Sequence, residues 1–90
     1  MQVVGTIKRI LPTEKHTESF KSRELHLDTE EQHTQCLSIK FNQGHTDVLD
    51  NYQPGQKVKI DLNLRGREIE KAGQPVVYNT IVGWRIEKVA

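Results

Sequence analysis

The sequence has little of what identifies most enzymes and membrane proteins. Its 90 residues include one cysteine, one tryptophan, two tyrosines and two phenylalanines, and the formal net charge is +1. One cysteine excludes an internal disulfide framework. No apolar run approaches the roughly 20 residues that a transmembrane helix needs. So small a net charge produces no strong overall field, and a charged ligand would have to be bound by a local cluster of side chains.

Catalytic and metal-binding patterns are missing as well. The four histidines do not have zinc-ligand spacing, and Cys36 has no histidine at a spacing that suggests a catalytic pair. No glycine-rich phosphate-binding motif and no nucleophile elbow occurs. We therefore predict a protein that is not an enzyme and that uses no metal and no cofactor. The first residues, MQVVGTIKRI, lack the charged and then apolar layout of a signal peptide, which together with the single cysteine predicts the cytoplasm.

What the sequence does contain is a series of segments in which every second residue is apolar, a pattern typical of half-buried β-strands. The clearest are LSIKF at 37–41 and VKIDLNL at 58–64, and the apolar residues of both, Leu64 included, are expected in the core. Strands are predicted at residues 2–11, 20–28, 34–42, 56–66 and 76–89.

Turn and helix signals separate these strands. Residues 12–19 and 68–75 are polar, contain proline or glycine, and are predicted to be loops. Residues 44–52 have apolar side chains at helical spacing, which predicts a short helix capped by Thr46. Pro54-Gly55 predicts a tight turn after this helix.

The order of strand, strand, strand, short helix, strand and strand predicts an all-β fold. It is the order of the OB-fold, a five-stranded Greek-key barrel with a short helix between strands 3 and 4. A chain of 90 residues has room for one modest core, so we expect residues 1–90 to form a single domain. Gly5, inside the first strand, predicts a bulge or a sharp bend there.

Several segments resemble the bacterial single-stranded DNA-binding proteins, and more closely the small tail-less OB-fold members of that kind. These segments are VVGTIKRIL, FKSRELHL, LSIKF, VLDNYQPGQKVKIDLNLRGRE and VVYNTIVGWRIEKV. The most informative part is YQPGQKVKIDLNLRGRE, which is similar to the family's helix end, glycine turn and fourth strand. The resemblance implies binding of single-stranded DNA without catalysis, and assembly into a homodimer or homotetramer.

Binding a single strand irrespective of its sequence requires cationic side chains along the phosphates and flat rings that stack on the bases. Alternation turns the cationic residues of the fourth strand outward, and Lys21 and Arg23 share one face of the second strand. Arg67 opens the predicted loop between the last two strands, where OB-folds often hold their ligand. The predicted cationic contacts are Lys8, Lys21, Arg23, Lys40, Lys57, Lys59, Arg65 and Arg67. Ordinary solvated charge is the competing interpretation of each one taken singly.

The predicted stacking residues are Phe20, Tyr78 and Trp84. Phe20 begins a strand, where alternation does not assign it a face. Tyr78 and Trp84 share the more apolar face of the last strand, which suggests the barrel lining, but a bulge near Gly83 would turn that face outward. Phe41 alternates with core residues and is predicted to be buried.

The fold by itself does not assign a function. The alternative function is a protein-interaction adaptor with no nucleic-acid ligand, which the near-neutral charge and the few aromatic residues favour. RNA is the other nucleic acid to consider, although the paired aromatic motifs of a cold-shock-like module are missing. A groove shared by Lys21, Arg23, Lys59, Arg65 and Arg67 would favour nucleic acid, and scattered charges would favour the adaptor.

Overall fold

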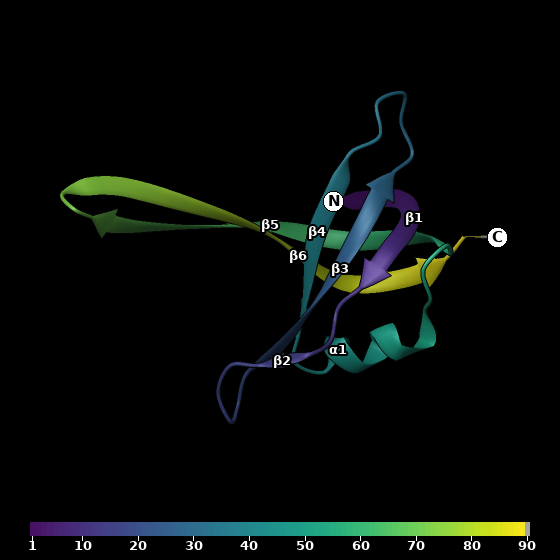
Figure 1. Cartoon of the computed structure of the whole chain (residues 1–90), viewed down its shortest axis with the longest axis horizontal. Coiled ribbons are helices and arrows are strands. Elements are labelled where there is room, and N and C mark those ends of the chain that lie inside the picture. The colour runs from purple at the N-terminus through teal and green to yellow at the C-terminus, as the bar shows by residue number, and fades with distance from the viewer. Residues whose placement is uncertain (90) are drawn as a thin grey trace.

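Five long strands close into a barrel in the computed structural model, which describes residues 1–89. The strands are β1 Gln2–Ile10, β2 Glu14–Lys15, β3 Lys21–Thr29, β4 Cys36–Asn42, β5 Lys57–Lys71 and β6 Gln74–Lys88 (Figure 1). β1 pairs with β5 on one side and with β3 on the other, so the order β1–β5–β6–β4–β3 returns to β1. All these pairs are antiparallel except β4 with β6, which is parallel. The predicted OB-fold is confirmed.

The barrel interior is filled by the alternating apolar residues of its strands. The buried core consists of Ile7, Leu25, Leu27, Ile39, Phe41, Leu49, Val58, Ile60, Leu62 and Ile86. The burial predicted for Phe41 is confirmed. The burial predicted for Leu64 is wrong, because β5 leaves the barrel after Leu62 and pairs from there on only with β6, so that Leu64 is 64% exposed.

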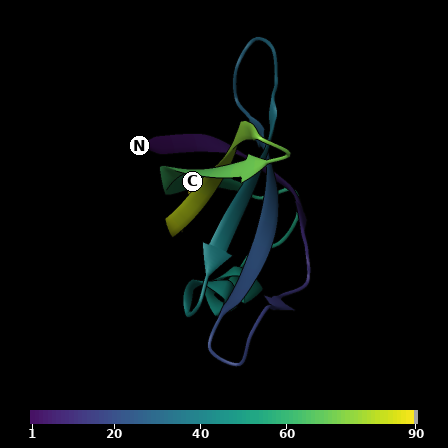
Figure 2. The same ribbon diagram turned by 90° about the vertical axis from the view of Figure 1, so that its left-hand side faces the viewer.

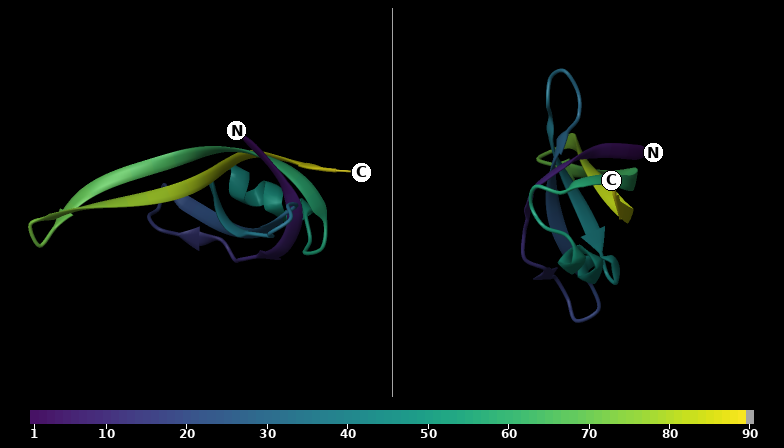
Figure 3. Two further views of the ribbon diagram at one scale, coloured as in Figure 1. Left: turned by 90° about the horizontal axis from the view of Figure 1, so that it is seen from above. Right: turned by 90° about the vertical axis from the view of Figure 1, so that its right-hand side faces the viewer.

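The last two strands continue beyond the barrel as a two-stranded ribbon, which we call the arm (residues 63–80). A loop was expected at 68–75, but the antiparallel register runs without a break to Lys71 opposite Gln74. Only Ala72 and Gly73 connect the strands, with φ of 53° and 77°. Positive φ at both positions is what a type I′ hairpin turn requires, and this turn matches the twist of the strands. The arm projects away from the barrel in Figure 3 and along the longest dimension of the 49 × 37 × 19 Å molecule (Figure 1).

A bulge in β6 reverses the face on which its outer residues lie. The register passes from Asp61 opposite Arg85 to Leu62 opposite Gly83, so Trp84 has no partner residue on β5. Of the two arrangements that the sequence left open for this strand, the one with a bulge near Gly83 is present. Tyr78 and Trp84 are 49% and 46% exposed, which excludes the alternative that these two rings line the barrel.

β1 bends where it exchanges one neighbour for the other. Gly5 pairs with Thr29 of β3 and with Val58 of β5 at the same time, and a Cβ atom on Gly5 would collide with the carbonyl oxygen of Asp28. Glycine therefore permits the close approach of the two backbones. The shift in register lies farther along the strand, between Ile7 and Arg9.

A short helix covers one end of the barrel. It consists of α1 (His45–Val48) and the 3₁₀ turn η1 (Leu49–Asn51), and it lies at the end opposite the β3–β4 hairpin (Figure 2). The cap predicted at Thr46 is wrong, because the helix begins after Gly44 and Thr46 is buried within it. The Thr46 hydroxyl instead donates a 2.8 Å hydrogen bond to the carbonyl oxygen of Gln43.

Two of the predicted connections between elements, residues 12–19 and the turn at Pro54-Gly55, have different outcomes. Residues 12–19, predicted to be a loop, contain the two-residue strand β2, which pairs with the start of β3. The predicted turn at Pro54-Gly55 is confirmed, and Gly55 has a φ of 93°. Within residues 1–89, no helix has the length and apolar character needed to cross a membrane.

Candidate nucleic-acid interface

The residues predicted to contact nucleic acid fall into three groups in space. Two cations lie against the helix, two lie in ion pairs on the barrel, and Lys40, Arg65, Arg67, Tyr78 and Trp84 lie on β4, the arm and the adjoining part of β6, while Lys8 and Phe20 lie outside these groups. Each group has its own surroundings, which decide whether its charge is free to bind a phosphate.

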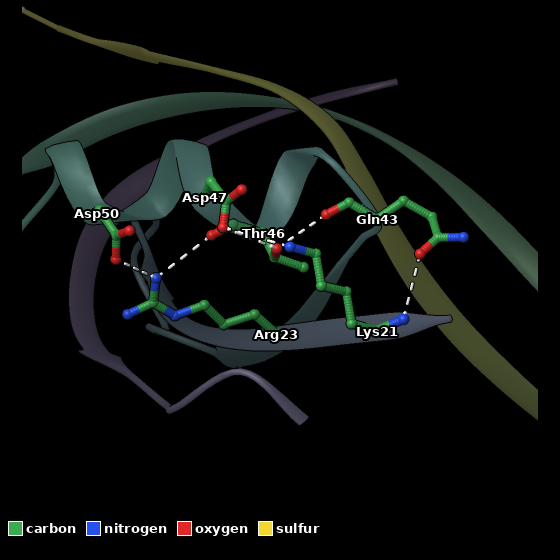
Figure 4. Close-up of polar contacts among 6 residues, drawn as sticks. All are labelled: Lys21, Arg23, Gln43, Thr46, Asp47 and Asp50. Atoms are coloured by element: carbon green, nitrogen blue, oxygen red, sulfur yellow. Dashed lines mark hydrogen bonds and ion pairs between the residues drawn. The ribbon is translucent and has the colours of Figure 1, made fainter. Parts of the chain in front are cut away.

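Arg23 is turned toward the helix and away from the outer surface. Its guanidinium donates hydrogen bonds to the carbonyl oxygen of Leu11 (2.8 Å) and, as Figure 4 shows, to the carbonyl oxygen of Thr46 (3.3 Å) and to Asp50 Oδ1 (2.7 Å). The side chain is only 17% exposed. Arg23 therefore holds the β1–β3 connection and the helix against the barrel.

Lys21 has a related position at the start of β3. Its Nζ lies 3.5 Å from Asp47 Oδ1 on α1, and its backbone N–H donates to Gln43 Oε1 (Figure 4). Lys21 and Arg23 alternate in phase with the core residues of β3, so they face inward at the end of the barrel. These two cations therefore lie against the helix and not on the arm that carries Arg65 and Arg67.

The two lysines at the start of β5 are neutralised locally. Lys57 Nζ lies 2.8 Å from Glu30 Oε1, and Lys59 Nζ lies 3.7 Å from Glu87 Oε1, which also lies 3.3 Å from a nitrogen of Arg85. Exposed pairs of this kind contribute about 0–1 kcal/mol to stability. A phosphate would have to compete with these carboxylates for both lysines.

The arm separates its charges by face, because strand alternation and register assign every residue to one side. We call the side with the arginines the basic face, and its residues are Arg65, Arg67, Ile69, Lys71, Gln74, Val76, Tyr78 and Thr80. We call the other side the acidic face, and its residues are Leu64, Gly66, Glu68, Glu70, Pro75, Val77 and Asn79. The ribbon therefore has three cations and no carboxylate on one side, and two carboxylates and no cation on the other.

On the basic face, a cation and an aromatic ring lie directly opposite each other. Arg67 pairs with Tyr78, and the next pair on this face toward the barrel is Arg65 with Thr80. Opposed residues on an antiparallel pair have Cβ atoms about 4.5–5.5 Å apart. The guanidinium of Arg67 and a half-exposed ring are therefore separated by no more than the length of one nucleotide.

The outer surface of the barrel continues this face. Lys40 of β4 is the parallel partner of Val82, and Val82 in turn pairs with Asn63. Trp84 follows Val82 on β6. Among residues 1–89, no carboxylate oxygen lies within the 4.0 Å ion-pair distance of Lys40, Arg65 or Arg67.

Lys8 and Phe20 lie elsewhere on the molecule. Lys8 is exposed at the register shift of β1. Phe20 is 40% exposed and stacks on His16, with ring centroids 5.4 Å apart. The register connects neither residue to the basic face.

Lys71 belongs to the basic face but was missed, because residues 68–75 were expected to be a loop. The signal that could have identified it is the dipeptide Ala72-Gly73 between two runs that continue as strands. The sequence did not single out Arg9 either. The register shift between Ile7 and Arg9 breaks the alternation of β1 and places Arg9 opposite His26.

Arg9 belongs to a polar row on the outer surface of β1 and β3. It donates to Nδ1 of His26 (2.7 Å), and Nε2 of His26 lies 2.6 Å from Glu24 Oε2. This hydrogen bond from His26 lowers the pKa of Glu24, partial burial opposes the shift, and the Ser38 hydroxyl and the Lys40 charge lower the pKa further. Glu24 thus stays ionised beside Lys40.

Comparisons with known proteins agree with this architecture. The family model described as a domain of unknown function, DUF3127, matches residues 2–87. A search of the curated proteins found no match. Crystal structures of the mitochondrial single-stranded DNA-binding protein Rim1 from S. cerevisiae align with TM-scores of 0.76 (Form 2) and 0.77 (Form 1), at 16% and 15% sequence identity. Each alignment covers 99% of this chain and 92% of the Rim1 chain, and at this identity the likeness shows the fold alone.

Proposed function

The chain belongs to the DUF3127 family, a domain of unknown function, and we propose that it binds single-stranded DNA without catalysis. The phosphates contact cations of the arm and of the adjoining barrel surface, and the bases stack on exposed rings. Rim1, which shares the fold, is a single-stranded DNA-binding protein, and this supports DNA over RNA as the ligand.

The observation that carries the proposal is the separation of charge on the arm. Its basic face presents Arg65, Arg67 and Lys71 beside Tyr78, with no carboxylate on the same side. Positive side chains along a backbone path, combined with a ring that can stack on a base, are what sequence-independent binding of single strands requires. The main contacts proposed are Lys40, Arg65, Arg67, Lys71, Tyr78 and Trp84. Additional contacts farther from the arm are proposed at Lys8, Phe20, Lys57 and Lys59.

The experiment is a fluorescence-anisotropy titration of the protein with an oligothymidine of about 12 nucleotides, a length within the range that one OB-fold covers. The double substitution Arg65→Gln, Arg67→Gln is expected to weaken binding at least about tenfold, because a hydrogen bond to a charged group contributes about 1.5–3 kcal/mol. The slope of log K against log salt should become less steep by about 0.7 for each phosphate contact that is lost.

Lys88→Gln serves as the matched control. It removes one positive charge from the exposed end of β6 that lies farthest from the arm. Unchanged affinity in the arginine variant, or an equal loss in the Lys88 variant, would remove the arm from the binding site. The absence of any salt-sensitive binding by the unsubstituted protein at micromolar concentration would refute the function itself.

A protein-interaction adaptor is the second candidate, and two observations favour it. Lys21 and Arg23 contact the helix and lie apart from Arg65 and Arg67, as scattered charges would. Leu64 and Val77 are 64% and 59% exposed on the acidic face, on either side of the pair Gly66–Asn79, and exposed apolar side chains mark protein interfaces when a partner covers them. Because Val77 lies on the face opposite Arg65, Arg67 and Tyr78, Val77→Ser should leave DNA binding intact.

We further propose that the protein acts in the cytoplasm and as a homo-oligomer. The single cysteine, Cys36, supports a reducing compartment. The exposed apolar residues of the arm support the oligomer, because a second copy could cover them.

A further inference from the structure

We propose that the protein recognises the identity of one base of the bound strand. This base enters the fork where β4 and β6 separate. This inference rests on the proposed function and adds a selective subsite to it. The fork lies at the base of the arm, where the two strands cross steeply (Figure 1).

The fork exists because the parallel pairing of these strands is short. They pair only at Ile39–Phe41 with Ile81–Gly83. In the described chain, no pairing joins residues 36–38 to residues 78–80, and a hollow of about 430 Å³ lies between them. Its volume is sufficient for a nucleobase to enter between the strand edges.

The polar groups at this hollow are suited to the edge of a base. An asparagine side chain offers both a donor and an acceptor, and a hydroxyl can act as either. The Asn79 amide lies over Gly66, 3.6 Å from where a Cβ atom would be, and the Thr80 hydroxyl is next along the chain. Neither side chain is hydrogen-bonded within residues 1–89, so both are free to bond a ligand.

The fork is also the hollow best placed for a nucleotide by charge. Lys40 lies at its β4 side, and Arg65 is directly opposite Thr80 on the basic face. Tyr78 lies two residues before Thr80 on β6 and belongs to the same face. A base in the fork would thus have phosphate-binding cations on both sides of it and a ring beside it.

Three other hollows of the molecule are less suitable, because two or more carboxylates line each of them, and a fourth, which Lys15, Glu18, Phe20 and Lys21 line, lies at the β2–β3 connection away from the basic face. Of the three, one contains Glu14 and Glu24, another Glu68 and Glu70, and the last Asp28 with two glutamates. A phosphate group would be repelled from each of these, whereas no carboxylate lines the fork.

The test compares oligothymidine with oligocytidine of equal length, about 12 nucleotides. These two strands have the same backbone and the same ring size and differ in the hydrogen-bonding edge of the base. We expect the unsubstituted protein to prefer one of them about tenfold, as hydrogen bonds to a base edge do elsewhere. Asn79→Ala and Thr80→Val should each reduce the ratio of the two affinities to about threefold or less, with the salt dependence unchanged.

Two controls separate this inference from the proposed function. Asn51→Ala removes an exposed amide from η1, at the far end of the barrel, and should leave the ratio as it is. Arg65→Gln, Arg67→Gln should weaken binding of both oligonucleotides equally and preserve the ratio. Equal affinity of the unsubstituted protein for both strands, or a ratio that neither fork variant changes, would overturn the base-reading site while leaving the binding function in place. Failure to bind either strand would overturn both.

Discussion

At position 83, the packing of one side chain leaves room for nothing larger than hydrogen. A Cβ atom on Gly83 would lie 2.5 Å from Cζ and 2.7 Å from Cε1 of Phe41, well inside van der Waals contact. Phe41 is fully buried and cannot move without disturbing the rest of the core. Gly83 thus allows β4 and β6 to cross closely, and the bulge that follows it exposes Trp84.

We predict that Gly83→Ala lowers the free energy of unfolding by about 1–3 kcal/mol, the usual cost of overpacking a core. Gly66→Ala is the control, because its Cβ would meet only Asn79 Oδ1 at an ordinary contact distance of 3.6 Å. Urea denaturation of both variants provides the measurement. A Gly83 variant as stable as the Gly66 variant would mean that Phe41 can shift, contrary to this account.

At the scale of elements, the cations of β3 and those of β5 have opposite roles. Arg23 joins three segments: it bonds the carbonyl oxygens of Leu11 and Thr46 and the carboxylate of Asp50. Arg67 is exposed on the arm and is not ion-paired in the described residues. One arginine therefore contributes to stability and the other is available to a ligand.

These different roles predict opposite effects for the same substitution at the two arginines: one should change stability and the other should change DNA affinity. Arg23→Met should lower the free energy of unfolding by about 1–3 kcal/mol, because buried carbonyl groups lose their hydrogen-bond donor, and the affinity of the folded protein for oligothymidine should change less than about twofold. Arg67→Met should leave the unfolding transition where it is and weaken oligothymidine binding. Thermal denaturation and anisotropy titrations on both variants decide the matter, and a large loss of affinity in the folded Arg23 variant would contradict the assignment.

At the scale of the whole molecule, the arm is a ribbon that the barrel does not cover. An isolated two-stranded hairpin is at best marginally stable in water. This one exposes Leu64 and Val77 on the acidic face, and both of its edges are unpaired beyond the barrel. Association of copies through this face would remove apolar surface from water and would leave the basic face of each arm free.

We therefore predict a particle of at least twice the 10.4 kDa chain mass in light scattering. Leu64→Ser should shift the population toward the monomer, because it replaces an exposed apolar side chain of the acidic face with a hydroxyl. Val48→Ser, at an exposed position on α1, should not. A single 10.4 kDa species across a range of concentrations would eliminate the oligomer.

The sequence alone determined the barrel. Strict alternation in residues 37–41 and 58–62 predicted the core strands, because period-two burial is a local property of an extended backbone. The strand order around the short helix then sufficed for the OB-fold. For the last strand the sequence left two arrangements open, and the structure decided for the bulge at Gly83.

Only the tertiary structure decided which cations are free. Alternation places Lys21 and Arg23 in phase with Leu25 and Leu27, but the carboxylates that engage them, Asp47 and Asp50, lie more than twenty residues away in the chain. The length of the arm depends likewise on pairing between β5 and β6 across a turn whose residues were expected to belong to a longer loop. Alternation assigns a residue to one side of its own strand, whereas what covers that side is set by contacts distant in sequence, and local pattern carries no information about those contacts.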